Sequence, residues 1–85
     1  MALRLPRSVT LPWRYVLKVR LVSDTEMATI ADETMEDAPD GLWVDASRII
    51  YIRKRLPAKR KIRVFGHELD HALNDWRHFI DDMNE

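Results

Sequence analysis

The sequence predicts an α+β fold in which a small antiparallel sheet of two to three strands packs against one long C-terminal helix. Two segments, 13–22 and 42–52, have the alternation or the residue types of strands, and the last third of the chain has helical periodicity. The 85 residues suit a single domain, which we expect to span 1–85. A domain of this size buries only about 60% of its unfolded surface, so a metal ion or a partner would add useful stability.

The first predicted strand is the alternating segment 13–22. One of its sides is apolar and the other carries Arg14, Lys18 and Arg20, which is the pattern of a half-buried strand. A sheet of so few strands leaves its edges open, and this long strand therefore predicts a homodimer. The apolar side consists of Trp13, Tyr15, Leu17, Val19 and Leu21.

An acidic stretch and a turn separate the two predicted strands. Within residues 24–40, the short apolar segment Met27–Ala31 predicts either an edge strand or a turn of helix. Residues 37–41, with the sequence Asp-Ala-Pro-Asp-Gly, are of the types that favour turns. We expect the second strand from Leu42 to Ile52, and Pro57 stands where a helix would begin.

The last third of the chain is predicted to be one long helix that lies on the sheet. Apolar residues recur there every three or four positions, in one narrow stripe centred near Leu69, and no glycine or proline follows Gly66. The stripe consists of Ile62, Phe65, Leu69, Ala72, Leu73, Trp76, Ile80 and Met83. Together with Trp43, the helix residues Trp76 and Phe79 are most simply interpreted as core aromatics.

The net charge of zero hides four blocks of alternating sign. Residues 1–23 and 46–66 are basic, whereas 24–45 and 67–85 are acidic apart from Arg77. We expect these blocks to neutralise one another when the chain folds. The alternative is a nucleic-acid-binding surface built on the second basic block. The acidic blocks would compete with phosphate for its cations, which disfavours a nucleic-acid partner.

Composition restricts both the metal chemistry and the location of the protein. The chain has no cysteine, which excludes disulfides and thiolate sites, so any metal must be held by His, Asp or Glu. No apolar run approaches the length of a membrane span, and the N-terminus lacks the apolar segment of a signal peptide. We therefore expect no membrane contact and a cytoplasmic location.

A candidate metal site lies within the predicted helix, in the segment His67-Glu68-Leu69-Asp70-His71. This is an H-E-x-x-H motif, whose four-residue spacing stacks two imidazoles one helical turn apart, where they can chelate one Zn²⁺. Glu68 is rotated off the ligand face and can take a proton from a water held by the metal. The chain has only three histidines, and two of them fall at this spacing, opposite the apolar stripe. The alternative is an ordinary solvated helix face.

The segment 66–75, which reads Gly-His-Glu-Leu-Asp-His-Ala-Leu-Asn-Asp, resembles the active-site helix of the gluzincin metallopeptidases. The longer stretch 41–76 is similar to the minimal zincins of the ImmA/IrrE type. The resemblance implies zinc ligands at His67 and His71, a catalytic acid/base at Glu68, and peptide hydrolysis. It further suggests that the edge of a strand at 48–52 holds an extended substrate by β-augmentation.

The chain departs from this family in the third zinc ligand. Gluzincins take a glutamate from a second helix, roughly twenty or more residues beyond the second histidine, whereas fourteen residues follow His71 here. Along an unbroken helix, His78 lies about 10 Å from His71, which is too far for the two to share one ion. The other candidates are an acid of 24–45, another chain or water. On the same helix they include Asp75, Asp81, Asp82 and Glu85; Asp75 also has an interpretation as a group that fixes ligand geometry.

The sequence thus predicts a zinc-dependent metallopeptidase that acts on a peptide or protein substrate. Glu68 would be the general base and His67 and His71 the metal ligands. The alternative is a catalytically inactive zincin-like protein with a binding or regulatory role, of the kind that a phage or mobile element encodes. The missing third ligand and the absence of a second lobe to close a cleft favour this alternative.

Overall fold

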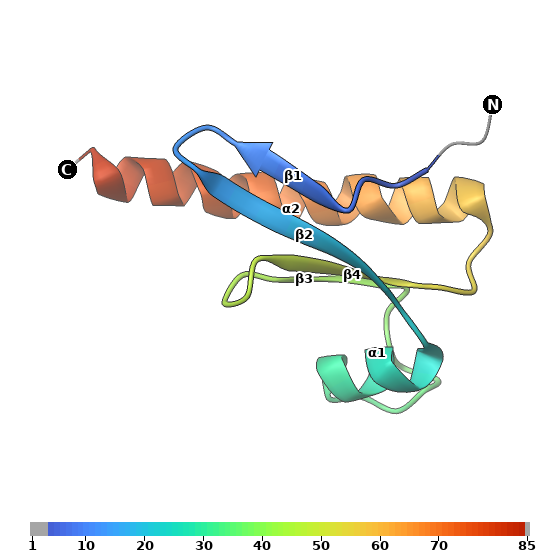
Figure 1. Cartoon of the computed structure of the whole chain (residues 1–85). Coiled ribbons are helices and arrows are strands. Elements are labelled where there is room, and N and C mark those ends of the chain that lie inside the picture. Colours follow the sequence, from blue (N-terminus) through green and yellow to red (C-terminus); the bar gives the residue numbers. More distant parts are fainter. Residues whose placement is uncertain (1–3, 85) are drawn as a thin grey trace.

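A computed structural model describes residues 4–84 and places them in a four-stranded sheet with two helices (Figure 1). The α+β class is therefore confirmed, and the long C-terminal helix begins after Pro57 as expected. The predicted size of the sheet is wrong, because two further strands belong to it. The elements are β1 (Ser8–Leu11), β2 (Tyr15–Val22), α1 (Asp24–Ala31), β3 (Gly41–Val44), β4 (Ile49–Arg53) and α2 (Ala58–Met83).

The sheet is mixed rather than antiparallel, with the strand order β1-β2-β4-β3. Two antiparallel hairpins, β1–β2 and β3–β4, join through a parallel pairing of β2 with β4, in which Val19 lies opposite Ile50. A parallel pair needs a long crossover connection, and here α1 and β3 provide it. The strand that was expected to leave an open edge, β2, consequently lies inside the sheet.

Two local features that shape this topology differ from the sequence-based expectation, and a third settles an alternative that the sequence left open. The short strand β1 was not predicted, and the segment expected as one strand to Ile52 is a hairpin that turns at Asp45–Arg48. Helix α1, rather than an edge strand, forms around Met27–Ala31. Its start is fixed by the Ser23 hydroxyl, which accepts a hydrogen bond from the Glu26 backbone N–H at 3.1 Å, an arrangement typical of helix N-termini.

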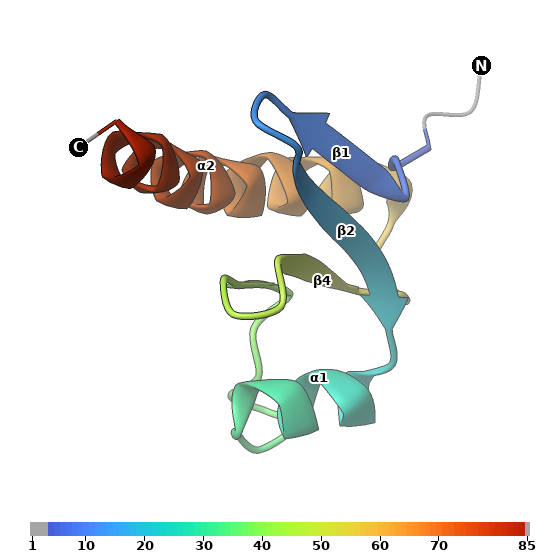
Figure 2. The same ribbon diagram turned by 60° about the vertical axis from the view of Figure 1, so that its left-hand side comes forward.

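The two faces of the sheet carry separate apolar clusters. Residues Ile50 and Ile52 point towards α2, while Tyr51 between them packs on the α1 side, as the alternation of a strand requires. Figure 2 shows α2 and α1 on the two sides of the strands. The α2 cluster has Leu17, Ile50, Ile52 and Ala72 at its centre, and the α1 cluster has Val22, Met27, Ala28 and Ala38.

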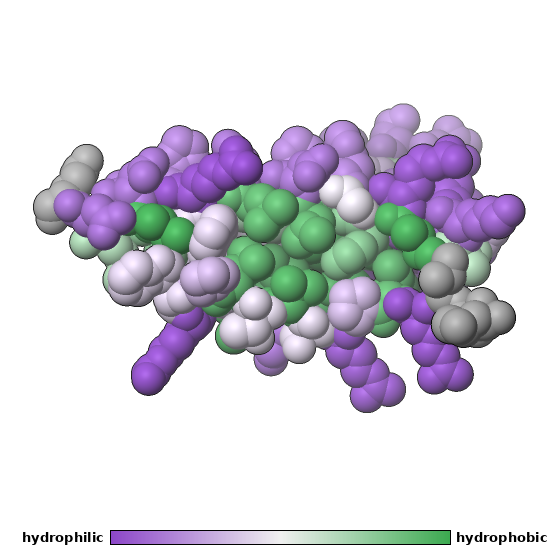
Figure 3. All heavy atoms as spheres, turned by 90° about the horizontal axis from the view of Figure 1, so that it is seen from above, coloured by the Kyte–Doolittle hydropathy of each residue, from purple (hydrophilic) through white to green (hydrophobic). Residues whose placement is uncertain are grey.

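Helix α2 covers its face of the sheet incompletely at its N-terminal end. Seen from above, apolar side chains form a continuous band between two polar rims (Figure 3). Leu21 of β2 is 47% exposed, and it lines a hollow of about 310 Å³ together with Val19 and Ile62.

Across the described residues, no helix has both the length and the apolar character needed to cross a membrane.

Aromatic contacts attach the C-terminal half of α2 to the hairpin β1–β2. The rings of Tyr15 and Phe79 lie 5.1 Å apart, and the Arg48 guanidinium lies 4.0 Å from the centre of the Tyr15 ring. The Trp76 indole N–H donates to the Pro12 carbonyl oxygen at 3.1 Å. Burial raises the pKa of Tyr15 above its ordinary value of 10.0. These contacts fix the C-terminal half of α2 against the sheet.

A buried arginine fastens the connection before β3 to the sheet. Arg53 is 6% exposed and makes ion-pair contacts with Asp24 at 3.7 Å and with Asp40 at 4.0 Å. Its guanidinium also donates to three backbone carbonyl oxygens, those of Met35, Ala38 and Pro39. At 3.7 Å the contact with Asp24 is not a hydrogen bond, so the buried Asp24 Oδ1 has no hydrogen-bond partner in the described structure.

The acidic block 24–45 and the basic block 46–66 do neutralise one another in this region. Arg55 pairs with Asp24 at 2.7 Å, and Arg60 pairs with Asp40 at the same distance. With Arg53 also engaged, three of the basic side chains considered for a nucleic-acid surface bind carboxylates of the same chain. The geometry favours the charge-neutralising interpretation.

We predict that replacing Arg53 is far more harmful than replacing Arg55, although both pair with Asp24. Arg53→Ala should lower the free energy of unfolding by about 2–4 kcal/mol, because three backbone carbonyl oxygens lose their donor and two partly buried carboxylates lose an ion-pair contact. Arg55→Ala removes a side chain that is 69% exposed and should cost under about 1 kcal/mol. Urea unfolding followed by circular dichroism measures both values. Equal losses would show that Arg53 does not hold the connection in place.

Candidate metal centre

Helix α2 brings the three predicted site residues to the flank of the helix that faces the β3–β4 hairpin. His67 and His71 are one turn apart and both are exposed, since they lie away from the buried position of Ala72. Their ring centres are 4.9 Å apart and the ring planes are nearly perpendicular, at 89°. Two neutral imidazoles at this separation offer nitrogen lone pairs to a shared space.

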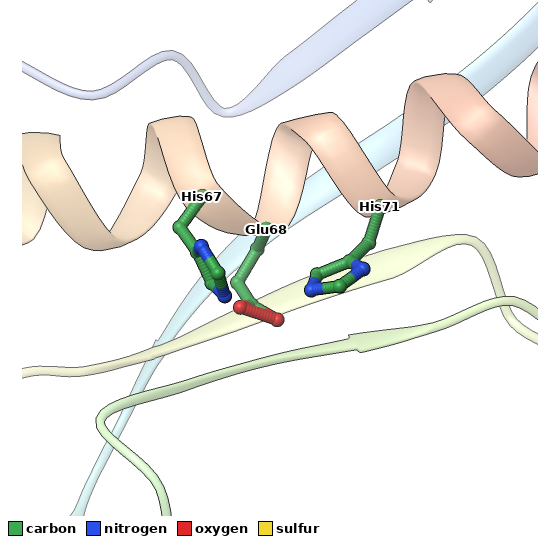
Figure 4. A group of neighbouring side chains, drawn as sticks. All are labelled: His67, Glu68 and His71. Atoms are coloured by element: carbon green, nitrogen blue, oxygen red, sulfur yellow. The ribbon is translucent and has the colours of Figure 1, made fainter.

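The Glu68 side chain extends between the two imidazoles, towards β3 and β4 (Figure 4). One ligand atom from each of His67, Glu68 and His71 lies within 4.8 Å of the others. Glu68 is only 7% exposed, yet no hydrogen bond or ion pair joins it to another described side chain. Among the described residues the buried side-chain oxygen without a hydrogen-bond partner is Asp24 Oδ1, so the Glu68 oxygens remain open to solvent and to a ligand. The group can therefore hold a metal ion.

The close approach of α2 to β3 depends on Gly41. A Cβ atom at this position would overlap Val64 Cγ1 and would lie 3.2 Å from Glu68 Cγ. The missing side chain therefore allows the Val64–Glu68 turn of the helix to rest directly against the strand. As a result, the Glu68 carboxylate lies beside the backbone of β3 and not behind a layer of side chains.

Two hollows meet at Glu68 and follow the gap between α2 and β3. The first, of about 410 Å³, is lined by Asp40, Arg63 and His67 among others. The second, of about 300 Å³, is lined by Trp43, His71, Asn74 and Asp75 among others. Because Glu68 lines both, the two hollows are neighbours, and we call them the two arms of a cleft along α2 and β3.

A hydrogen bond closes the far arm of the cleft. The Trp43 indole N–H donates to Asp75 Oδ2 at 2.6 Å, which joins β3 to α2 one turn beyond His71. The sequence left Asp75 open between a third metal ligand and a structural role, and this contact supports the structural role. It did not indicate Trp43 as the partner, because the two residues are 32 positions apart and no local pattern links them.

The candidates for a third ligand lie apart from this group. Helix α2 is continuous to Met83, so His78 remains about 10 Å away along the helix. Asp75 is engaged by Trp43. Within residues 4–84, the group of potential ligands contains only His67, Glu68 and His71, which leaves out Asp81 and Asp82 as well. Glu85 lies outside the described residues.

The topology corrects the prediction that the strand at 48–52 has a free edge for a substrate. β4, which contains the segment 48–52 except for Arg48, is paired on both sides, with β2 and with β3. It therefore has no free edge for β-augmentation. The strand with a free edge beside His67, Glu68 and His71 is β3, which pairs only with β4 among the described strands.

Comparison with protein-family models, with curated proteins and with solved structures finds no match to this chain.

We predict that His67 and His71 together bind one divalent metal ion per chain. Titration with Zn²⁺ should give one site, which His67→Ala or His71→Ala should abolish, while His78→Ala should leave it intact. Affinity should fall below about pH 6, because ligating imidazoles must be neutral. Isothermal titration calorimetry with each variant measures this. Stoichiometric binding to the double variant with alanine at both positions would place the metal elsewhere.

Proposed function

We propose that the protein is a zinc-dependent peptidase of the gluzincin type, with His67 and His71 as metal ligands and Glu68 as the general base. The observation that carries the proposal is the placement of the Glu68 carboxylate, which lies within 4.8 Å of both imidazole ligands and has no hydrogen-bond or ion-pair partner among the described side chains. The H-E-x-x-H spacing of these residues agrees with it.

The donor set fits zinc better than the hard cations. Imidazole nitrogen suits zinc, whereas magnesium and calcium prefer sites built from oxygen alone. When bound, zinc polarises a peptide carbonyl and lowers the pKa of a coordinated water to about 7. Glu68 accepts the proton in this scheme and passes it to the leaving amine, which requires it to remain outside the ligand set.

The free edge of β3 supports a peptide as the substrate. An extended peptide can add to an unpaired strand edge by main-chain hydrogen bonds, without a requirement for one particular sequence. Such a peptide would lie in the cleft beside Glu68, because Gly41 brings this part of β3 against the helix. The scissile carbonyl would thus pass the histidine pair.

A catalytic zinc site usually has three protein ligands and one open position, and the described chain supplies two besides Glu68. A second copy of the chain in a homodimer is one source of the third ligand, and an acidic residue brought by a partner is another. The homodimer thus stays a prediction, although its original argument from an open edge on β2 does not apply.

The same observation favours a second candidate, a metal-binding protein without catalysis. If Glu68 itself ligates the ion, the group becomes a His₂Glu site contained in one helix. Glu68 is then no longer available as a base, and the metal would stabilise α2 or organise a partner. The two candidates differ in the position of a single carboxylate.

We predict that Glu68→Gln separates the two candidates. In a peptidase, the variant should keep its zinc and lose hydrolysis by roughly 10²–10⁴-fold, because the amide cannot take a proton. In a non-catalytic site, zinc affinity should fall at least about tenfold with no hydrolysis to lose. Zinc content is measured by mass spectrometry of the metal, and cleavage with an unfolded protein and a mixed peptide library.

The matched control is Asp70→Asn, which changes an exposed acid of the same motif. It should alter neither zinc content nor cleavage. A wild-type protein that holds zinc but cleaves nothing after prolonged incubation would contradict the peptidase proposal, whatever the result with Glu68→Gln.

A further inference from the structure

Apart from Glu68, which lines both arms of the cleft, the charges left without an ion-pair partner in the described structure have opposite sign in the two arms. In the first arm, Arg63 has no carboxylate partner within 4.0 Å in the described structure. The carboxylate of the same arm, Asp40, pairs with Arg53 and Arg60 instead. In the second arm, Asp75 is the acid, and no described Lys, Arg or His lies within ion-pair distance of it. Its hydrogen bond from the Trp43 indole leaves the negative charge in place.

The direction of β3 relates these charges to the direction of a bound peptide. The strand starts at Gly41, beside Val64 and Glu68, and reaches Trp43, which contacts Asp75. Antiparallel pairing is slightly more stable per residue than parallel pairing. A peptide that pairs antiparallel with β3 therefore has its N-terminal part near Asp75 and its C-terminal part near Arg63.

We propose that the cleft selects extended peptides with a basic side chain before the bond at Glu68 and an acidic side chain after it. This inference rests on the proposed function, in which a peptide pairs with the edge of β3. Asp75 attracts the basic side chain and Arg63 the acidic one, so that a peptide of the opposite charge order meets like charges at both ends. Asp75 and Arg63 are thus specificity residues, and neither touches the reacting atoms.

The test uses four synthetic peptides of equal length with the same central residues. They carry Lys then Glu, Glu then Lys, only neutral side chains, or Lys at both positions. Binding to zinc-loaded Glu68→Gln protein is measured by fluorescence anisotropy, and cleavage by wild-type protein is measured by mass spectrometry. The Lys-then-Glu peptide should bind about tenfold more tightly than the reversed peptide at low ionic strength, with a smaller ratio at high salt.

Two variants and a control assign the preference to the named residues. Asp75→Asn keeps an oxygen that can accept from Trp43 but removes the charge, and Arg63→Gln removes the opposite charge. Each should reduce the binding ratio by about threefold, and the pair together should abolish it. Lys59→Gln changes another exposed cation of α2 that lines neither arm, and it should leave the ratio unchanged.

The outcomes separate this inference from the proposed peptidase function. Preferential binding without cleavage would support the charge selection and overturn the hydrolysis. Cleavage with no dependence on charge order, or with the reversed order preferred, would support hydrolysis and overturn the selection. If no peptide is bound and none is cleaved, both proposals fail.

Discussion

The missing side chain of Gly41 is the constraint on which the geometry of the cleft depends. A helix and a strand that pack together are normally kept apart by side chains from both. Such a layer of side chains would hold the Glu68 carboxylate well away from the backbone of β3. At Gly41 the Val64–Glu68 turn fills the space of the absent Cβ atom. The candidate metal ligands His67 and His71, with Glu68 between them, are consequently adjacent to a strand edge that is free for pairing. Arg53 and the Trp43–Asp75 hydrogen bond hold the strand in this position from the two sides.

The helix and its site residues could be predicted because their signals are local. A helical apolar stripe and two histidines four residues apart require no knowledge of the rest of the chain. Helix α2 accordingly begins where Pro57 predicted, and His67, Glu68 and His71 come together. The capping residues Ser23 and Glu26 were also a local signal for α1. They could have decided between helix and strand for Met27–Ala31 in favour of the helix.

The sheet could not be predicted to the same depth, because its pairing is set by distant residues. Val19 faces Ile50 across a parallel ladder, and nothing in either strand alone distinguishes this from an antiparallel partner. The free edge was therefore expected on β4, whereas it lies on β3. The residues that shape the cleft, Gly41 and Trp43, belong to a four-residue strand whose importance comes from what packs on it, and no periodicity reveals that.

A zinc-loaded crystal structure with an anomalous difference map at the zinc absorption edge tests the central claim most directly. We predict one peak bonded to a nitrogen of His67 and a nitrogen of His71 at about 2.0–2.1 Å. The Glu68 carboxylate should lie beyond bonding distance, and the map would identify the remaining ligand. A peak bonded directly to Glu68 would contradict its role as the base, and a peak away from both histidines would contradict the metal site itself.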